Sequence, residues 1–311
     1  MPPWTRPKAH CAGLGLLLAV ACAPAPTPRD SPLAPAVAVA SRDVPTATET
    51  PAAPRLDGAT VSHPGCFTLL ELGTDTPLRL GDQPCEERTI PASTFKIPHA
   101  LIALDTGVVT DPNALVRWDG TRYRSMKAWE RDHSLRSAVY ESVVWFFQGT
   151  ARAIGRERMT EYLQAFGYGN ATVDGPIDRF WLDGGSVQVS PDEQVRFLAD
   201  LYLDRLPRGQ AHVPVLREML VRPPSSFAGR VAEGTTIPAL DPAATLSAKT
   251  GTGRHGEGSV TWLVGHVACP QHQYVFASRV IADAPPGRLS PATTHGLAAL
   301  DELAVLRCDG P

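Results

Sequence analysis

Lysine is scarce in this chain, which also lacks clustered charge of one sign. Only four of its 29 lysine and arginine residues are lysines: Lys8, Lys96, Lys127 and Lys249. The formal net charge is -3, and the basic residues are dispersed along the sequence. This distribution offers no electrostatic footprint for phosphates, so nucleic acid is excluded as an expected partner. The ligand should be a small molecule or a peptide.

Metal-binding motifs are missing as well. The nine histidines form neither a His-Glu-x-x-His nor a His-x-His-x-Asp pattern, so a zinc hydrolase has little support and no metal is expected. His99 follows Pro98 in an expected helix, and we interpret it as a packed helix residue.

The N-terminal apolar stretch, residues 11–21, is too short to span a bilayer. It follows Arg6 and Lys8, which is typical of a secretory signal peptide, expected here over residues 1–22. Small residues precede Cys22, so cleavage would leave this cysteine free to carry a lipid that tethers the protein to the membrane. Simple cleavage nearby is the alternative. Both predict an exported, periplasmic protein.

Residues 23–57 are rich in proline and alanine and contain no aromatic residue. They predict an extended linker, because this composition buries too little apolar surface to offset its ordering entropy. The folded part should run over residues 58–311 as one catalytic domain.

Secondary-structure signals place strands at both ends of the folded part and helices between them. Strands are expected at residues 66–72, 245–249, 260–268 and 274–282, with turns at 73–75 and 269–272. Ser190, Pro191 and Glu193 form a capping box that starts a helix. Ser290 and Pro291 start a final helix.

These elements predict an α/β protein of the α+β type. Strands from both ends of the chain should pair in one central antiparallel sheet, flanked by helices. The helical middle should form a second lobe, with the functional cleft between the lobes.

Ser93 and Lys96 lie three residues apart where an expected helix begins. That spacing puts both side chains on one face, so the lysine amine can reach the serine hydroxyl beside the N–H groups of a helix start. A desolvated lysine can give up its proton and an arginine cannot, so Lys96 in a lysine-poor chain indicates acid–base chemistry. Pro98 inside this helix would leave the Thr94 carbonyl without its donor, and such a broken rule beside a candidate site favours function.

Two further motifs are weak by themselves. Residues 249–251, Lys-Thr-Gly, precede a Gly-rich turn; in a strand, Lys249 and Thr250 would point into the cleft while Gly251 lets a substrate backbone approach. Ser142 opens residues 142–144, Ser-Val-Val, which otherwise could be merely a helix start.

The three motifs, in this order, resemble those of the serine β-lactamases and penicillin-binding proteins. Ser-Val-Val in the middle, rather than Ser-x-Asn, is similar to the class D, or oxacillinase-type, β-lactamases. Other similar stretches follow in order between residue 65 and the C-terminus, at residues 118–120, 129–133, 168–170, 180–182 and 262–265. The resemblance implies the fold of that superfamily and hydrolysis of β-lactam antibiotics.

The resemblance also implies roles for individual residues. Ser93 would be the acylated nucleophile, and Lys96, carrying CO2 as an N-carbamate, the base for acylation and deacylation. Ser142 would pass the proton to the leaving amine, in a field shaped by Lys249. No other cofactor is implied. The backbone N–H groups of Ser93 and Thr252 would form the oxyanion hole. Trp181 would donate a hydrogen bond to the carbamate, and Phe95, Val144 and Leu182 would form the apolar carbamate pocket. Thr250, Gly251 and Arg288 would bind the substrate.

Some positions depart from the family pattern or stay open. Trp145 stands where proline is frequent, and Thr252-Gly253 where an aromatic residue is frequent, so the cleft rim should differ. Arg288 has a looser spacing, and a surface cation beside the last helix is the alternative. The preferred β-lactams and the oligomeric state remain open.

Two other functions share the three motifs. A β-lactam sensor stays acylated and signals through transmembrane helices and an effector, neither of which is seen in this chain. A peptidoglycan transpeptidase or carboxypeptidase usually carries Asn in the middle motif and has extra domains.

The cysteines of the folded part predict disulfides, because an exported chain meets an oxidising compartment. We expect Cys66 to pair with Cys85, since both lie in neighbouring β-rich segments before Ser93. Cys269 and Cys308 remain as the second pair.

Overall fold

The structure, a computed structural model, describes residues 65–308. The expected signal peptide over residues 1–22, with Cys22, and the linker over residues 23–57 lie outside the described residues.

A five-stranded antiparallel sheet with the order β2-β1-β5-β4-β3 forms the centre of the molecule. Its strands are β1 (Cys66–Glu71), β2 (Leu78–Leu80), β3 (Thr245–His255), β4 (Gly258–Ala268) and β5 (Gln273–Ala282). β1 pairs with β5 along its whole length, from Cys66 opposite Arg279 to Glu71 opposite Tyr274. The prediction that both ends of the chain build one antiparallel sheet is confirmed.

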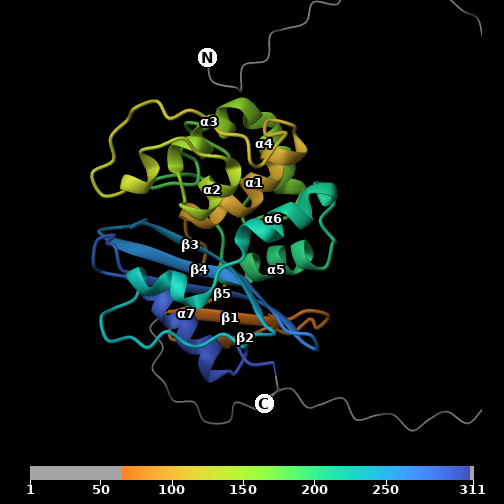
Figure 1. The fold of residues 1–311 in the computed structure, drawn as a ribbon, viewed down its shortest axis with the longest axis vertical. Helices are drawn as coiled ribbons and strands as arrows, with labels where there is room; N and C mark the ends of the chain where they lie inside the picture. Colours follow the sequence, from red (N-terminus) through yellow and green to blue (C-terminus); the bar gives the residue numbers. More distant parts are fainter. Residues whose placement is uncertain (1–64, 309–311) are drawn as a thin grey trace, which may run out of the picture. The chain divides into compact units, whose positions relative to one another are not determined.

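Helices cover both faces of this sheet. In Figure 1, α1 to α6 lie on one side of it and α7 on the other. The helices are α1 (Lys96–Asp105), α2 (Leu135–Tyr140), α3 (Val144–Ile154), α4 (Arg156–Ala165), α5 (Pro191–Tyr202), α6 (Val213–Leu220) and α7 (Pro291–Glu302), with 3-10 turns η1 (Ala92–Phe95), η2 (Lys127–Trp129), η3 (Gln210–His212) and η4 (Pro224–Arg230). The mainly helical second lobe is confirmed.

Successive side chains of β4 point to opposite faces of the sheet. Trp262 and Val264 belong to the core shared with the helical lobe. Thr261 faces the other way, and its Oγ1 accepts a hydrogen bond of 3.1 Å from the backbone N of Ala292 at the start of α7. Because helices cover both faces, β4 is buried along nearly its whole length, including its polar residues Ser259, Thr261 and His266.

The caps read from the sequence start α5 and α7 as predicted. The Ser190 hydroxyl accepts from the Glu193 N–H while Glu193 accepts from the Ser190 N–H, with Pro191 at the first helical position. The Ser290 hydroxyl accepts from the Thr293 N–H before α7.

Two local expectations were wrong. Residues 92–95 form the 3-10 turn η1, and α1 begins only at Lys96. Pro98 therefore lies in the first turn of α1, where N–H groups lack intrahelical acceptors in any case. The Gly-rich turn expected directly after residue 251 lies instead at residues 256–257, because β3 continues to His255 and pairs with β4 throughout.

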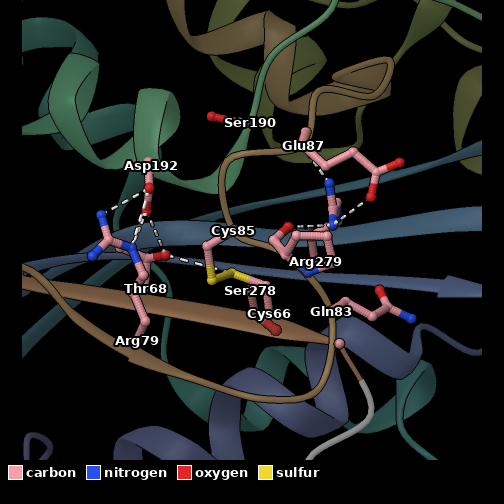
Figure 2. Close-up of a disulfide and its surroundings, with 12 residues drawn as sticks. Cys66, Thr68, Arg79, Gln83, Cys85, Glu87, Ser190, Asp192, Ser278 and Arg279 are labelled. Atoms are coloured by element: carbon pink, nitrogen blue, oxygen red, sulfur yellow. Dashed lines mark hydrogen bonds and ion pairs between the residues drawn. A yellow bond between two sulfur atoms is a disulfide. The ribbon is translucent and has the colours of Figure 1, made fainter.

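Disulfides join Cys66 to Cys85 and Cys269 to Cys308. The first ties β1 to the segment that leads to η1, and Figure 2 shows it beside the side chain of Arg279. Arg279 is fully buried and donates hydrogen bonds to the backbone oxygens of Pro84 and Glu87 in that same segment. The chain is therefore held to the sheet by a covalent link and a buried guanidinium just before the candidate nucleophile.

Among residues 65–308, every helix is too short or too polar to cross a membrane.

Candidate active site

A cleft of about 820 Å³ opens beside η1, β3 and η4. It is lined by residues that the sequence singled out for the site, namely Ser93, Ser142, Val144, Leu182, Thr250, Gly251, Thr252 and Arg288. Lys96, Lys249, Phe95 and Trp181 are buried. The fold thus gathers residues from distant parts of the chain.

Ser93 lies in the 3-10 turn η1, and Lys96 is the first residue of α1. Their side chains meet, with Lys96 Nζ 2.8 Å from Ser93 Oγ. Ser93 is half-buried and lines the cleft, whereas Lys96 is fully buried. Ala92, directly before the serine, has a φ of 47°, a left-handed conformation that a non-glycine residue rarely adopts. Such strain clusters at functional sites.

The ammonium group of Lys96 sits in an aromatic environment. Burial lowers its pKa to about 7. Its Nζ lies 5.4 Å from the centroid of the Phe147 ring. Phe95 stacks on Trp181 with ring centroids 5.7 Å apart, and the buried Trp181 Nε1 has no hydrogen-bond partner among residues 65–308. A substantial fraction of Lys96 is therefore neutral at physiological pH, beside an aromatic cluster that contains an N–H donor without a partner among residues 65–308.

Ser142 and Lys249 form a second buried contact. Lys249 Nζ donates hydrogen bonds of 2.9 Å to Ser142 Oγ and of 2.9 Å to the Thr250 carbonyl oxygen. Burial holds the pKa of Lys249 well below its usual range, and the charges of Lys96, Arg222 and Arg230 add to this effect. Ser142 has a φ of 61°, so it too is a strained residue at the cleft.

Gly251 allows β3 to run against the turn that carries Ser93. A Cβ at this position would lie 2.9 Å from the Pro91 carbonyl oxygen and 3.3 Å from the Thr94 nitrogen. Only glycine permits this approach without displacement, and with it both Ser93 and Thr252 border the cleft.

Three residues near the site were missed. Phe147, in the apolar run after Ser142, contacts Lys96, and His99, interpreted as a packing residue, lies beside the same cluster. Arg230 lines the cleft at the end of η4 and is half-buried, whereas Arg288 is exposed. No sequence signal distinguished Arg230 in an arginine-rich chain.

Trp145 shows how one departure from the family pattern shapes the rim. Its indole donates a hydrogen bond of 3.0 Å to the backbone oxygen of Trp129, which lines the cleft. The Trp129 indole in turn donates to the Glu141 backbone oxygen at 2.9 Å. These bonds connect this wall of the cleft to Glu141, the residue before Ser142.

Comparison with known proteins identifies the family. The penicillin-binding-protein transpeptidase domain matches residues 65–294. β-Lactamase OXA-5 of Pseudomonas aeruginosa is 41% identical over 197 residues, covering 62% of this chain and 67% of that protein. A crystal structure of a class D β-lactamase from Bacillus subtilis superposes with a TM-score of 0.64 at 32% identity, over 79% of this chain and 93% of that one. The chain belongs to the class D serine β-lactamase family. The predicted fold and enzyme class, a serine hydrolase, are confirmed.

A sensor protein is also similar to this class D chain. The regulatory protein BlaR1 of Bacillus licheniformis is 35% identical over 194 residues, covering 62% of this chain but only 29% of BlaR1. The C-terminal domain of the BlaR penicillin receptor of that organism superposes with a TM-score of 0.65 at 29% identity, over 76% of this chain and 89% of that domain. The class D fold alone therefore does not separate turnover from sensing.

Within residues 65–308, no group of three or more His, Cys, Asp or Glu side chains could hold a metal ion.

Proposed function

We propose that this protein hydrolyses β-lactam antibiotics through an acyl-enzyme on Ser93. The observation that carries the proposal is the 2.8 Å contact between Ser93 Oγ and a fully buried Lys96 whose pKa is about 7. A lysine in this state accepts a proton at neutral pH, which an ordinary lysine, with a pKa near 10.4, does not.

Acylation uses two pairs of residues, Ser93 with Lys96 and Ser142 with Lys249. Lys96 takes the proton of Ser93, whose Oγ bonds to the lactam carbonyl carbon while the backbone N–H groups of Ser93 and Thr252 receive the developing oxyanion. The C–N bond of the ring then breaks. Ser142 gives its proton to the leaving nitrogen and regains one from Lys96, which is thereby neutral again, while Lys249, which donates to Ser142 Oγ, orients that hydroxyl.

Deacylation needs a general base that can reach a water molecule in the cleft. Lys96 takes the proton of a water molecule whose oxygen attacks the acyl carbon, and returns this proton to Ser93 Oγ as the bond between Oγ and the acyl carbon breaks.

The surroundings of Lys96 fit a CO2-derived carboxylate on its amine. A neutral amine can add CO2, and the unpartnered Trp181 N–H is a donor for the resulting acid group. Phe95 is buried beside Trp181, while Val144 and Leu182 are half-buried on the cleft wall that leads to Ser93. When bound, this group supplies an anionic general base in place of the amine.

The substrate carboxylate should bind to the basic residues that line the cleft. The described residues that line it include Lys127, Arg230 and Arg288 but no acidic side chain. We assign the substrate carboxylate to Thr250 and to these two arginines, with the Gly251 backbone lining the cleft beside them. The missing side chain of Gly251 makes room for the turn that carries Ser93, and not for the substrate as the sequence predicted. Arg230 makes the stronger contact because it is less exposed to solvent than Arg288.

We further propose that the protein is exported to the periplasm, with residues 1–22 removed and residues 23–57 acting as a linker to the catalytic domain. If Cys22 becomes the lipidated first residue, the linker tethers the enzyme to the membrane. The intact mass of the mature protein distinguishes a diacylglycerol adduct on Cys22 from simple cleavage.

Turnover of a chromogenic cephalosporin tests the proposed function. Steady hydrolysis over many equivalents is expected, and Ser93→Ala is the control that should show none. A single stoichiometric burst would instead support a sensor like BlaR1 or a transpeptidase.

A further inference from the structure

His99 is a buried polar residue with no role in the mechanism described above. It lies three residues after Lys96 in α1, so both side chains share one face of the helix. Its ring packs against Phe147 and Trp181, with centroids 5.0 and 5.3 Å away, and Lys96 Nζ lies over the same Phe147 ring. His99 therefore belongs to the pocket of Lys96.

The two ring nitrogens of His99 have different surroundings. Nε2 lies 3.0 Å from Thr150 Oγ1 in α3. Nδ1 is buried and finds no hydrogen-bond partner in the part of the chain that the structure describes. One nitrogen is thus anchored to the neighbouring helix, while the other is unused.

The Thr150 hydroxyl can select the tautomer of this ring. Burial is the largest cause of a lowering of the His99 pKa to about 3, so the imidazole is neutral and carries one N–H. Thr150 Oγ1 lies 3.0 Å from both His99 Nε2 and the Phe147 carbonyl oxygen. If the hydroxyl donates to Phe147, His99 donates from Nε2 and Nδ1 is an acceptor. If it donates to Nε2, the proton of His99 sits on Nδ1. Neither arrangement moves a heavy atom.

An anion in this pocket needs a second hydrogen-bond donor, which His99 can provide from Nδ1. The Trp181 N–H is a second buried polar atom without a partner, and its ring stands at 79° to that of His99. A carboxylate has two oxygens with about four acceptor positions, so a single indole leaves most of them unsatisfied in an apolar surrounding.

We propose that His99 is a positioning residue for the acid group that Lys96 carries, supplying Nδ1–H as a second hydrogen-bond donor beside the Trp181 indole. Thr150 fixes this tautomer through Nε2. The inference rests on the proposed function, because it presumes that Lys96 reacts with CO2.

Titration of CO2-depleted enzyme with 13C-bicarbonate, followed by the 13C NMR signal of the lysine carbamate, measures the role of His99 without substrate. His99→Leu should weaken the apparent bicarbonate affinity by about tenfold to a hundredfold, the range for a hydrogen bond to a charged group. His99→Asn, which keeps a donor, should lose less. His266→Leu, which removes a buried histidine in β4 that hydrogen-bonds Gln273, is the matched control and should bind as the parent does.

Histidine 15N NMR on the parent enzyme provides a test that does not depend on a variant's folding. With bicarbonate present, the His99 proton should reside on Nδ1, and Thr150→Val should weaken this preference. An unprotonated Nδ1, or a His99→Leu titration equal to that of the parent, would overturn the inference alone. No carbamate signal in a parent enzyme that still turns over β-lactam would instead refute carboxylation of Lys96, and the role of His99 with it.

Discussion

At the scale of single residues, the site depends on two buried lysines in different states. Lys96 has a pKa of about 7 and contacts the nucleophile, while Lys249 is held well below its usual pKa and donates to Ser142. The sequence indicated Lys96 through the scarcity of lysine, because an arginine could not release a proton there, and Lys249 through the Lys-Thr-Gly motif.

The pH dependence of turnover follows from the state of Lys96. Its lowered pKa makes the amine neutral above about pH 7 and protonated below, and the protonated form can neither take the proton of Ser93 nor add CO2. Turnover should fall as the pH drops through this value, and bicarbonate should restore CO2-depleted enzyme. Trp181→Ala should strengthen the bicarbonate requirement. Full turnover of degassed enzyme above about pH 7, with no response to bicarbonate, would show that Lys96 acts as a simple amine, and full turnover at pH 6 would contradict its role as the base.

Substrate affinity should depend more on Arg230 than on Arg288. Arg230 is half-buried, so its charge is less screened than that of the exposed Arg288. Arg230→Ala should raise the KM for a penicillin by about tenfold, and Arg288→Ala by less, following the loss of one charge-assisted hydrogen bond. Arg117→Ala, at an exposed position outside the cleft lining, is the control. Equal effects of the two cleft variants would count against this ranking.

At the scale of elements, the sequence correctly predicted the helix boundaries that depend on residues close together in the chain. The capping box of α5 and the Ser290 N-cap of α7 placed the starts of these helices, because the cap residues and their partners are neighbours in sequence. The extension of β3 to His255 was missed, since its glycines read as a turn and only pairing with β4 holds them in a strand. The η1 turn was missed for a related reason, because its shape depends on packing against β3.

The contact between β3 and η1 should be sensitive to one methyl group. Gly251→Ala would press a Cβ against the Pro91 carbonyl oxygen and displace the strand from the turn that carries Ser93. We expect kcat/KM to fall at least tenfold while the free energy of unfolding drops by about 1–3 kcal/mol, as for other overpacked sites. Gly296→Ala, which crowds Leu263 and Ser278 on the α7 face, should cost similar stability and leave kcat/KM unchanged. A parent-like kcat/KM for Gly251→Ala would remove the special role of this glycine.

At the scale of the whole molecule, the order of the motifs predicted the family and the sheet, but not every wall of the cleft. Arg230 comes from η4, ahead of the Lys-Thr-Gly motif, and its carbonyl oxygen accepts a hydrogen bond from the N–H of Ser290, the residue that caps α7. Phe147 and His99 follow their motifs closely, yet their burial beside Lys96 results from the packing of α1 on α3. Tertiary packing of this kind leaves no local pattern to read.

The disulfide between Cys66 and Cys85 should contribute to global stability rather than to catalysis. It closes a loop with a sequence separation of 19, for which a loss of about 2–4 kcal/mol in the free energy of unfolding is typical. The double variant Cys66→Ser/Cys85→Ser should therefore unfold at lower denaturant concentration and keep its kcat at room temperature. Peptide mapping that finds both cysteines as free thiols in the oxidised parent would show that this link does not form.

The most direct test of the account is the site and fate of the acyl group. Enzyme mixed with a slow penicillin and quenched in acid should carry one adduct, which peptide mapping by mass spectrometry locates on Ser93. Its decay should match the turnover rate, and Ser142→Ala should form the same adduct more slowly, because Ser142 only passes the proton to the leaving nitrogen. An adduct on Ser142, or turnover without any covalent adduct in the parent, would contradict the central role given to Ser93 and Lys96.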